Sequence, residues 1–227
     1  MWQQGVSLAG YALLTHLYAS THRLSWALAA LMLLTLAMLY PNLHARRASA
    51  WLTIIAVAAA LLSSWFRQHA VLILFVPPIV ANLALGWLFG HTLRAGSVPL
   101  VERLVRLLHP ENDIQDDAVW PYARRVTLLW ALLFHANALA CLLLALLAMP
   151  GGVLTSVGLT PALQLPIHWW SWYANLGCYA VAALLFLSEY SYRRYRFPWQ
   201  PYRNFFHFCQ RAVAVGPALL ASLRAPK

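Results

Sequence analysis

Several polar side chains interrupt the apolar stretches of this sequence, and they are the first candidates for chemistry. A polar or ionisable group in a lipid-facing segment is costly, so such groups usually face the interior of a helix bundle and serve a function there. The amides are also good partners for hydrogen bonds between helices, and this is their simpler interpretation. The residues of this kind are Asn82, His135, Asn137, Asn175 and Glu189.

Glu189 and His135 are the titratable members of this group, and either could act as a general base. A simpler interpretation of Glu189 is an ion pair with Arg193, one helical turn further on. Arg124 and Arg125 are its other candidate partners. A single histidine in an apolar segment is more often a packed hydrogen-bond donor than a proton carrier. The sequence therefore leaves catalysis open and favours a protein that is not an enzyme.

Arginines gather where the later apolar segments end, and they form a second candidate site. A guanidinium group presents several donors in one plane and binds phosphate or carboxylate groups well. We therefore expect a site for an anion or a lipid headgroup at this end of the bundle. Its predicted members are Arg94, Arg124, Arg125, Arg193 and Arg194.

Motifs for a bound cofactor are missing from the sequence. It contains no glycine-rich phosphate loop and no HExxH, GxSxG or CxxC motif. The nine histidines are scattered along the chain, so we expect no metal, no haem and no other cofactor. The three cysteines stand far apart in the sequence, and we expect buried free thiols at Cys141, Cys178 and Cys209.

Composition places these residues in a membrane protein. The residue types AVILMFWYC make up 62% of the 227 residues, and charged residues make up 10%. Soluble domains are about 45–50% apolar and about 25% charged, and a small soluble domain cannot hide the excess from water. The formal net charge of +10 is then explained by membrane topology and anionic lipid headgroups, so nucleic acid is not an expected partner.

Six apolar segments approach the length of a membrane span. A chain of this size leaves no room for a separate soluble domain, so the sequence predicts a single all-α transmembrane helix bundle over 1–227. The first segment is the weakest, because Thr15 and His16 interrupt it. The predicted spans are 5–20, 24–40, 48–66, 70–91, 126–148 and 167–189.

The charges of the connections predict the orientation of these spans. The connection 150–167 carries no Lys, Arg, Asp or Glu and leads into the aromatic stretch 168–173, as in an external loop with an interfacial anchor. The stretch 190–227 is basic and is predicted to be a cytoplasmic tail. Alternation then places both termini and fourteen basic residues inside, and leaves only Arg23 and Arg67 outside. This pattern predicts a multi-pass membrane protein with both termini in the cytoplasm.

Two amphipathic segments are predicted on the cytoplasmic side. The stretch 99–109 has apolar residues at i, i+3, i+4 and i+7 with charges on its other face, and Pro110 should end it. The second segment begins near Pro201 and should end at Gly216-Pro217. We expect both to lie flat in the membrane interface. The acidic run after Pro110 is interpreted as a solvated turn.

Two further patterns concern the interior of the bundle. Pro77-Pro78 should break or kink the fourth segment. The sixth segment carries small or polar residues at helical spacing, which predicts one face turned into the bundle. These residues are Ser171, Asn175, Cys178, Ala182, Leu185 and Glu189.

Several short stretches resemble a family of bacterial inner-membrane proteins encoded in aryl polyene and xanthomonadin-type pigment clusters. The resemblance covers about residues 71–217. It lies in Pro77-Pro78, Asn82, Leu88-Phe89-Gly90-His91-Thr92-Leu93, Pro99-Leu100-Val101-Glu102-Arg103, His109-Pro110-Glu111, Tyr122-Ala123-Arg124-Arg125-Val126-Thr127, Trp130, Asn175, Glu189-Tyr190, Tyr192-Arg193-Arg194 and Arg196-Phe197-Pro198. This chain departs from the family at His91, where an arginine is usual, and in a longer insert at 150–166.

The resemblance implies a setting in lipid biosynthesis, where acyl chains grown on an acyl carrier protein pass to a lipid. The implied partners are the phospholipid bilayer, an acyl carrier protein and other biosynthetic membrane proteins. Three functions remain open at this point. The first is docking or handling of carrier- or lipid-linked acyl intermediates at the cytoplasmic face. The second is an acyl or lipid transferase that uses Glu189 or His135, and the third is a small transporter or flippase subunit.

Overall fold

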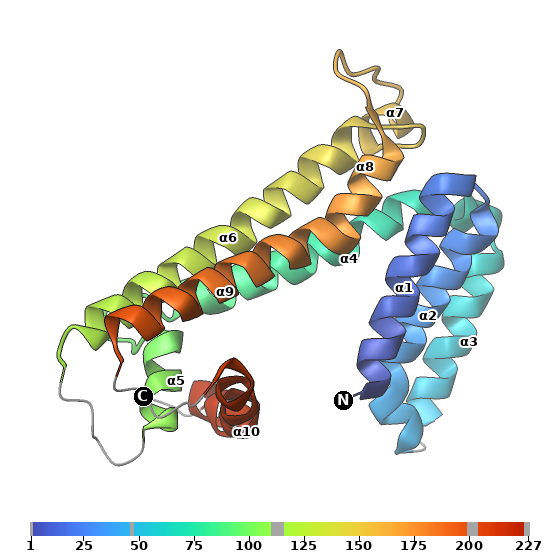
Figure 1. Ribbon diagram of the computed structural model, residues 1–227. Coiled ribbons are helices and arrows are strands. Elements are labelled where there is room, and N and C mark those ends of the chain that lie inside the picture. Colours follow the sequence, from blue (N-terminus) through green and yellow to red (C-terminus); the bar gives the residue numbers. More distant parts are fainter. Residues whose placement is uncertain (1, 46–47, 110–115, 199–203, 225–227) are drawn as a thin grey trace. The chain divides into compact units, whose positions relative to one another are not determined.

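The computed structural model describes residues 2–45, 48–109, 116–198 and 204–224 (Figure 1). Helices dominate this part of the chain, which confirms the all-α class. Within it, three helical stretches are long and apolar enough to cross a membrane. They are Val71–His91, Val119–Leu147 and Ile167–Arg196. The arrangement with six spans and both termini inside remains a prediction.

The helices follow the predicted apolar segments, with shifts at their ends. They are α1 (Trp2–Thr21), α2 (Leu24–His44), α3 (Ala48–Leu62), α4 (Ser64–His91), α5 (Leu100–Leu108), α6 (Val119–Leu147), α7 (Val153–Ser156), α8 (Ile167–Trp172), α9 (Cys178–Arg196) and α10 (Phe205–Arg224). A π-helical turn, Tyr173–Gly177, joins α8 to α9. Two short strands, β1 (Ala148–Met149) and β2 (Leu165–Pro166), flank α7.

The largest differences from the predicted boundaries concern the third, fourth and fifth segments. The third segment was predicted to run to 66, but α3 ends at Leu62 and α4 begins at Ser64. The fifth begins at Val119 rather than at 126. Just before it, the side chain of Asp116 accepts a hydrogen bond from the Ala118 amide (2.9 Å), so this part of the acidic run forms the turn that leads into the helix. Residues 110–115 of this run lie outside the described part of the chain.

The chain divides into two compact units. Unit 1 comprises Met1–Ala81 with Ala138–Tyr179, and unit 2 comprises Asn82–Asn137 with Ala180–Lys227. The long helices α4 and α6 contribute to both units, and nearly all of α9 belongs to unit 2.

Unit 1 is built around the hairpins of α1, α2 and α3. Alanines such as Ala27 and Ala30 are fully buried where α1 and α2 pack, and small residues of this kind let helix backbones approach closely. The hydroxyl of Tyr11 donates to the carbonyl of Leu74 (3.2 Å), which ties α1 to α4. The ring of Phe75 meets Trp170 edge to face, with centroids 4.7 Å apart.

The predicted external loop is closed at its base. Strands β1 and β2 pair in parallel, with Ala148 opposite Leu165 and Met149 opposite Pro166. The residues between them form α7 and two turns, and Gly158 in the second turn has a positive φ of 81° with open space around it. The loop therefore projects from a short ladder that joins the end of α6 to the start of α8.

Unit 2 is packed around aromatic rings. The rings of Phe89 (α4), Trp130 and Phe134 (α6), Phe186 (α9) and Phe208 (α10) form a chain of neighbours with centroids 5.6–6.4 Å apart. Such pairs prefer edge-to-face and offset arrangements at these separations. The rings lie between these four helices and line the space among them.

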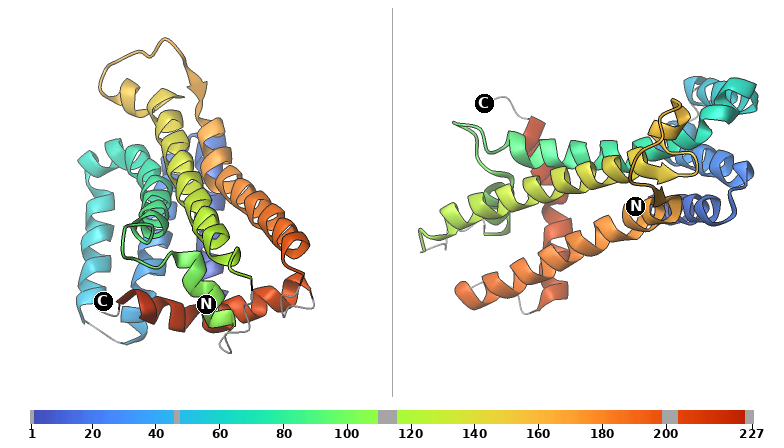
Figure 2. Two further views of the ribbon diagram at one scale, coloured as in Figure 1. Left: turned by 90° about the vertical axis from the view of Figure 1, so that its left-hand side faces the viewer. Right: turned by 90° about the horizontal axis from the view of Figure 1, so that it is seen from above.

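Helices α5 and α10 pack against each other in unit 2, and Leu108 meets Phe208 at the centre of their contact. Figure 2 shows α10 lying across the direction of α6 and α9 in both of its views. The stretch 190–227 is therefore not a simple tail, because its first residues complete α9 and most of the remainder forms α10.

Buried threonines hold α5 in place. The first amides of a helix have no partner within it, and the N-cap residue Pro99 offers no side-chain acceptor. The Oγ1 atoms of Thr92 and Thr127 accept hydrogen bonds from the amides of Leu100 (3.0 Å) and Val101 (3.2 Å). The start of α5 is thereby fixed to the end of α4 and to α6.

The predicted helix end at Gly216-Pro217 was wrong, and so was a break at Pro77-Pro78, where the alternative of a kink remains a prediction. Helix α4 continues through Pro77-Pro78, and α10 continues through Pro217 to Arg224. A proline removes a single backbone donor, and transmembrane helices tolerate it where neighbouring groups satisfy the freed carbonyl. After Pro217 the sequence is Ala-Leu-Leu-Ala-Ser-Leu-Arg, most of which favours helix strongly enough for the helix to continue.

The predicted small face of the sixth segment is offset by the π-helical turn, because such a turn holds an extra residue. Asn175 was predicted to bond between helices, but its amide donates to the carbonyl and the hydroxyl of Ser171 in its own segment (2.9 and 3.2 Å). The wider turn leaves the Ser171 carbonyl open to a side-chain donor. Beyond the turn, Cys178 is buried and Glu189 half-buried, as the pattern predicted.

Candidate functional site

Unit 2 contains a partly open cavity of about 260 Å³. Its lining comes from α4, α5, α6, α9 and α10, and it is apolar except for one acid and one base. The apolar residues are Phe89, Leu100, Val101, Leu104, Val126, Trp130, Phe134, Phe186, Phe208 and Leu219, and the charged residues are Glu189 and Arg193.

The amphipathic helix α5 was predicted correctly, but its apolar face has a different use. Val101 and Leu104 line the cavity, and Leu108 is buried against α10. The charged side of α5 stays outward, where Arg106 pairs with Glu102 (2.7 Å). The helix therefore covers the cavity with its apolar face.

An ion pair closes the polar end of the cavity. Arg193 Nε lies 3.3 Å from Glu189 Oε1, and the two side chains are only 7% and 10% exposed. The hydroxyl of Tyr122 on α6 donates to the same Glu189 oxygen (3.1 Å). This confirms the predicted pairing of Glu189 with an arginine and selects Arg193 as the partner.

Arg193 retains donor capacity after this pairing. Its Cζ lies 4.3 Å from the centre of the Phe208 ring, a cation–π contact that uses no hydrogen-bond donor. Its Nη2 is buried, and no acceptor for it exists in the part of the chain that the structure describes. A buried donor without a partner costs about 1–3 kcal/mol, and more when it is charged.

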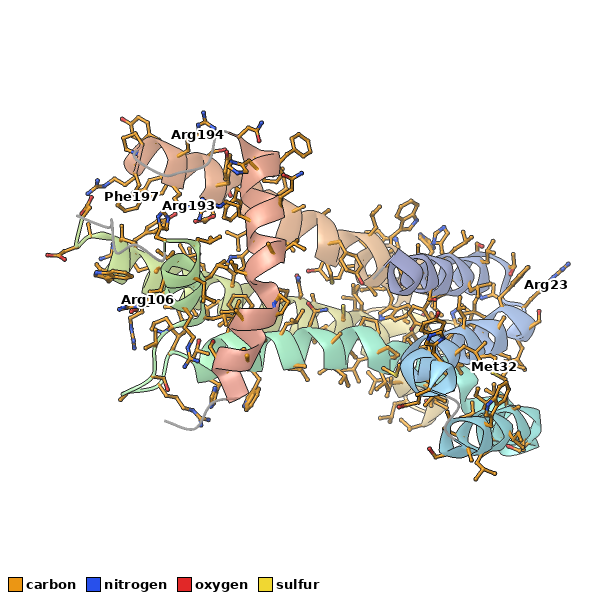
Figure 3. All side chains as sticks on the ribbon, turned by 90° about the horizontal axis from the view of Figure 1, so that it is seen from below. Arg23, Met32, Arg106, Arg193, Arg194 and Phe197 are labelled. Carbon is orange, nitrogen blue, oxygen red and sulfur yellow. The ribbon has the colours of Figure 1, made fainter. Side chains whose placement is uncertain are left out.

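The predicted arginine cluster is divided between the interior and the surface. Arg193 lies inside the unit, whereas Arg194 points outward and contacts the hydroxyl of Tyr190 (3.2 Å; Figure 3). Arg94, Arg124 and Arg125 are also exposed. Arg124 Nη2 donates to the carbonyl of Leu93 (2.8 Å), which brings the start of α6 next to Arg94.

The mid-helix polar residues do not line the cavity. Asn82 and Asn137 are buried elsewhere in unit 2. Nδ1 of His135 lies 2.7 Å from the carbonyl of Ala131, so this nitrogen carries the proton and donates to its own helix. The His135 ring also lies against Gly86 on α4. Of the two predicted catalytic candidates, only Glu189 belongs to the cavity.

Sequence reasoning missed Tyr122 as a partner of Glu189, because these residues stand 67 positions apart. It also missed that two cysteines meet. The sulfur atoms of Cys141 and Cys178 lie 3.6 Å apart in the core of unit 1, and both are free thiols, as predicted. Both contacts depend on how distant helices pack, and local sequence spacing does not predict such contacts.

Within the described ranges, no group of three His, Cys, Asp or Glu side chains could hold a metal ion. Comparison of the chain with protein-family models, curated proteins and solved structures finds no match. Fold and site together define a helical protein with candidate membrane spans and an apolar, aromatic-lined cavity that ends at a buried ion pair.

Proposed function

We propose that this protein is a multi-pass inner-membrane component of an aryl-polyene-like lipid biosynthesis pathway. In this proposal it holds the acyl chain of a carrier- or lipid-linked intermediate at the cytoplasmic face. The observation that carries the proposal is the apolar cavity of unit 2, which ends at Glu189 and Arg193 and is bordered by helices rich in exposed arginine. The resemblance of residues 71–217 to proteins of such pathways supports the setting.

The membrane location is supported by the outer surfaces of the long helices. Large apolar side chains that are exposed on α6 and α9 would be costly in water, and lipid is their natural solvent. The exposed leucines of these helices include Leu128, Leu129, Leu132, Leu139, Leu142, Leu143, Leu184 and Leu187. In the proposed topology all six apolar segments span, both termini are inside, and α5 and α10 lie at the cytoplasmic surface.

The cavity suits part of an acyl chain. Its volume of about 260 Å³ is slightly below the usual range of ligand pockets, which is about 300–1,000 Å³, so it suits a segment of a chain. A hydrocarbon segment gains about 25 cal/mol for each Å² of apolar surface removed from water. Aromatic rings such as Trp130 and Phe186 offer flat surfaces that also suit a conjugated chain.

The exposed arginines supply the docking part of the proposal. Arg94, Arg124, Arg125 and Arg194 lie on helix ends and stay accessible. An acyl carrier protein is acidic, and complementary charge raises the rate and specificity of such encounters. A phospholipid headgroup would engage the same donors through its phosphate.

A cavity-filling variant tests the acyl-binding part. Leu104→Trp places a bulky ring in the cavity, and Leu187→Trp makes the same change on the exposed face of α9. Protein in nanodiscs is exposed to a medium-chain acyl probe that carries a diazirine, and the crosslinked peptides are identified by mass spectrometry. Labelling around Trp130 and Phe186 should be lost in Leu104→Trp and kept in Leu187→Trp. Equal labelling of both variants would refute acyl binding in this cavity.

Charge reversal tests the docking part. Native mass spectrometry of the purified protein should retain an acyl carrier protein or an anionic phospholipid. The double variant Arg124→Glu/Arg194→Glu should lose most of that partner, whereas Arg23→Glu, an exposed change on the predicted outer side, should keep it. Unchanged retention in the double variant would show that these arginines do not dock the partner.

A membrane-embedded transferase is a second candidate function, because Glu189 is a carboxylate on the cavity wall. Glu189→Gln keeps the size of the side chain and removes the base. If this protein transfers the acyl group, the variant should still take up the acyl probe but form no product. Normal pigment or lipid product from Glu189→Gln would reject the transferase. No contact described above favours the transporter alternative.

A further inference from the structure

We propose that Arg193 recognises the carbonyl oxygen of an acyl ester or thioester, and that the two charged residues of the cavity together reject a free carboxylate. This inference rests on the proposed acyl-binding function and names the chemical group at the polar end of the ligand. The evidence for it is the side chain of Arg193, which is more than nine-tenths buried and lines the cavity. Its Nη2 has no acceptor among the described residues.

The contacts of Arg193 leave donors available to a ligand. The guanidinium Cζ lies 4.3 Å from the centre of the Phe208 ring, so this ring holds the group at the cavity wall without accepting a hydrogen bond. Nε lies within ion-pair distance of Glu189, yet neither Nε nor Nη2 makes a hydrogen bond among the described residues, and Nη2, which has no ion-pair contact either, is the donor for another acceptor. An oxygen at the end of a chain lying among the aromatic rings would satisfy Nη2 and remove the penalty of leaving it unpaired.

The net charge of the cavity determines which kind of ligand oxygen can bind to Arg193. Among the described residues that line the cavity, Arg193 and Glu189 are the only charged groups, and they neutralise each other. A bound carboxylate or phosphate would leave one buried negative charge without a partner, which is strongly unfavourable away from water. A carbonyl oxygen accepts the hydrogen bond and adds no charge.

Four matched probes separate these possibilities. They share one medium-chain acyl tail with a diazirine near its end, and differ only in the head: a methyl ester, an N-acetylcysteamine thioester, a free acid, and a hydrocarbon without oxygen. The ester stands for a lipid-linked source and the thioester for a carrier-linked source. The nanodiscs are made from ether phospholipids, which contain no competing acyl carbonyl.

The wild-type protein should bind the ester or the thioester about tenfold or more tightly than the acid or the hydrocarbon, as expected for a hydrogen bond to a charged donor. The better of the two carbonyl probes identifies the source. Arg193→Met should abolish the preference, and Arg106→Met, the same change at an exposed position on α5, should retain it. Because Arg193→Met leaves Glu189 unbalanced, the neutral double variant Glu189→Gln/Arg193→Met is measured alongside and should also show no preference.

The decisive variant is Glu189→Gln alone. It leaves the positive charge of Arg193 unbalanced, so the free acid should now bind more tightly than the ester. Equal binding of all four probes to the wild-type cavity would overturn this inference and leave the acyl-binding proposal intact. Labelling of the cavity by none of the probes would overturn both. Wild-type preference for the free acid would show that the charge argument is wrong.

Discussion

The contact between Gly86 and His135 predicts a large effect from a single methyl group. A Cβ atom added at Gly86 would lie 2.5 Å from His135 Nδ1 and 2.7 Å from its Cε1. Real Cβ atoms do not approach other atoms this closely, so the ring must move. It is held by the hydrogen bond from Nδ1 to the carbonyl of Ala131. Gly86→Ala must therefore break that bond or separate α4 from α6.

The magnitude follows from three terms. Loss of the hydrogen bond costs about 0.5–1.5 kcal/mol, and overpacking costs about 1–3 kcal/mol. The change from glycine to alanine within a helix stabilises the helix by about 1 kcal/mol. We therefore expect Gly86→Ala to lower the free energy of unfolding by about 1–3 kcal/mol.

Gly90, one helical turn further along α4, provides the matched control. A Cβ there would lie 3.9 Å from the Cβ of Ala131, an ordinary contact. Gly90→Ala should therefore be neutral or stabilise the protein by up to about 1 kcal/mol. The assay is a reversible unfolding titration in mixed micelles, followed by tryptophan fluorescence.

A rescue experiment isolates the cause. His135→Ala removes the ring, so Gly86→Ala should cost little when it is added to that background. A double-mutant cycle over the two positions should give a coupling energy of more than about 1 kcal/mol. If Gly86→Ala proves as stable as Gly90→Ala, or if His135→Ala gives no rescue, the described packing of α4 on α6 is incorrect.

Three further changes address one residue of the cavity wall and two residues that support it, in the same unfolding assay. Phe208→Ala removes a side chain that is 2% exposed and should destabilise the protein by about 3–5 kcal/mol. Phe206→Ala, at a position that is 75% exposed, should destabilise it far less. Equal losses of stability would contradict the placement of α10. Tyr122→Phe removes the hydroxyl that donates to Glu189 and should cost about 1–3 kcal/mol, so an unchanged stability would argue against this contact. Thr127→Val removes a hydrogen bond that caps the start of α5 and should lower the stability of the protein by about 1 kcal/mol. Amide hydrogen exchange at the start of α5 should become faster. Slow exchange there would show that the cap is dispensable.

Local patterns predicted the helices and one contact of the site well. Apolar runs such as 70–91 became helices, and the spacing of four between Glu189 and Arg193 placed their side chains on one helix face, where they form an ion pair. The apolar spacing of 99–109 correctly predicted an amphipathic helix. These features depend on neighbours within a few turns, and sequence spacing reports such neighbours directly.

The remaining features depend on contacts between distant segments. Arg193 and Arg194 are adjacent and identical in type, yet one is buried under Phe208 and the other is exposed. Their difference follows from where α10 packs, and the sequence near α9 does not encode that. The π-helical turn at Tyr173–Gly177 was not predicted from local spacing either. The uninterrupted helix at Pro217 is different, because the helix-favouring residues after the proline account for it.

The two-residue ladder of β1 and β2 closes the loop at its base. The length of the loop therefore does not determine the distance between α6 and α8, the helices that it connects. Since the ladder holds Ala148 against Leu165, residues added between them need not move α6 or α8. The entropy of closing a loop rises slowly, by about 0.6 kcal/mol for each doubling of its length. Related chains could therefore carry inserts of very different length here with little effect on the helices. For the same reason, the open turn at Gly158 is a suitable point for inserting an epitope tag that reports which side of the membrane it occupies.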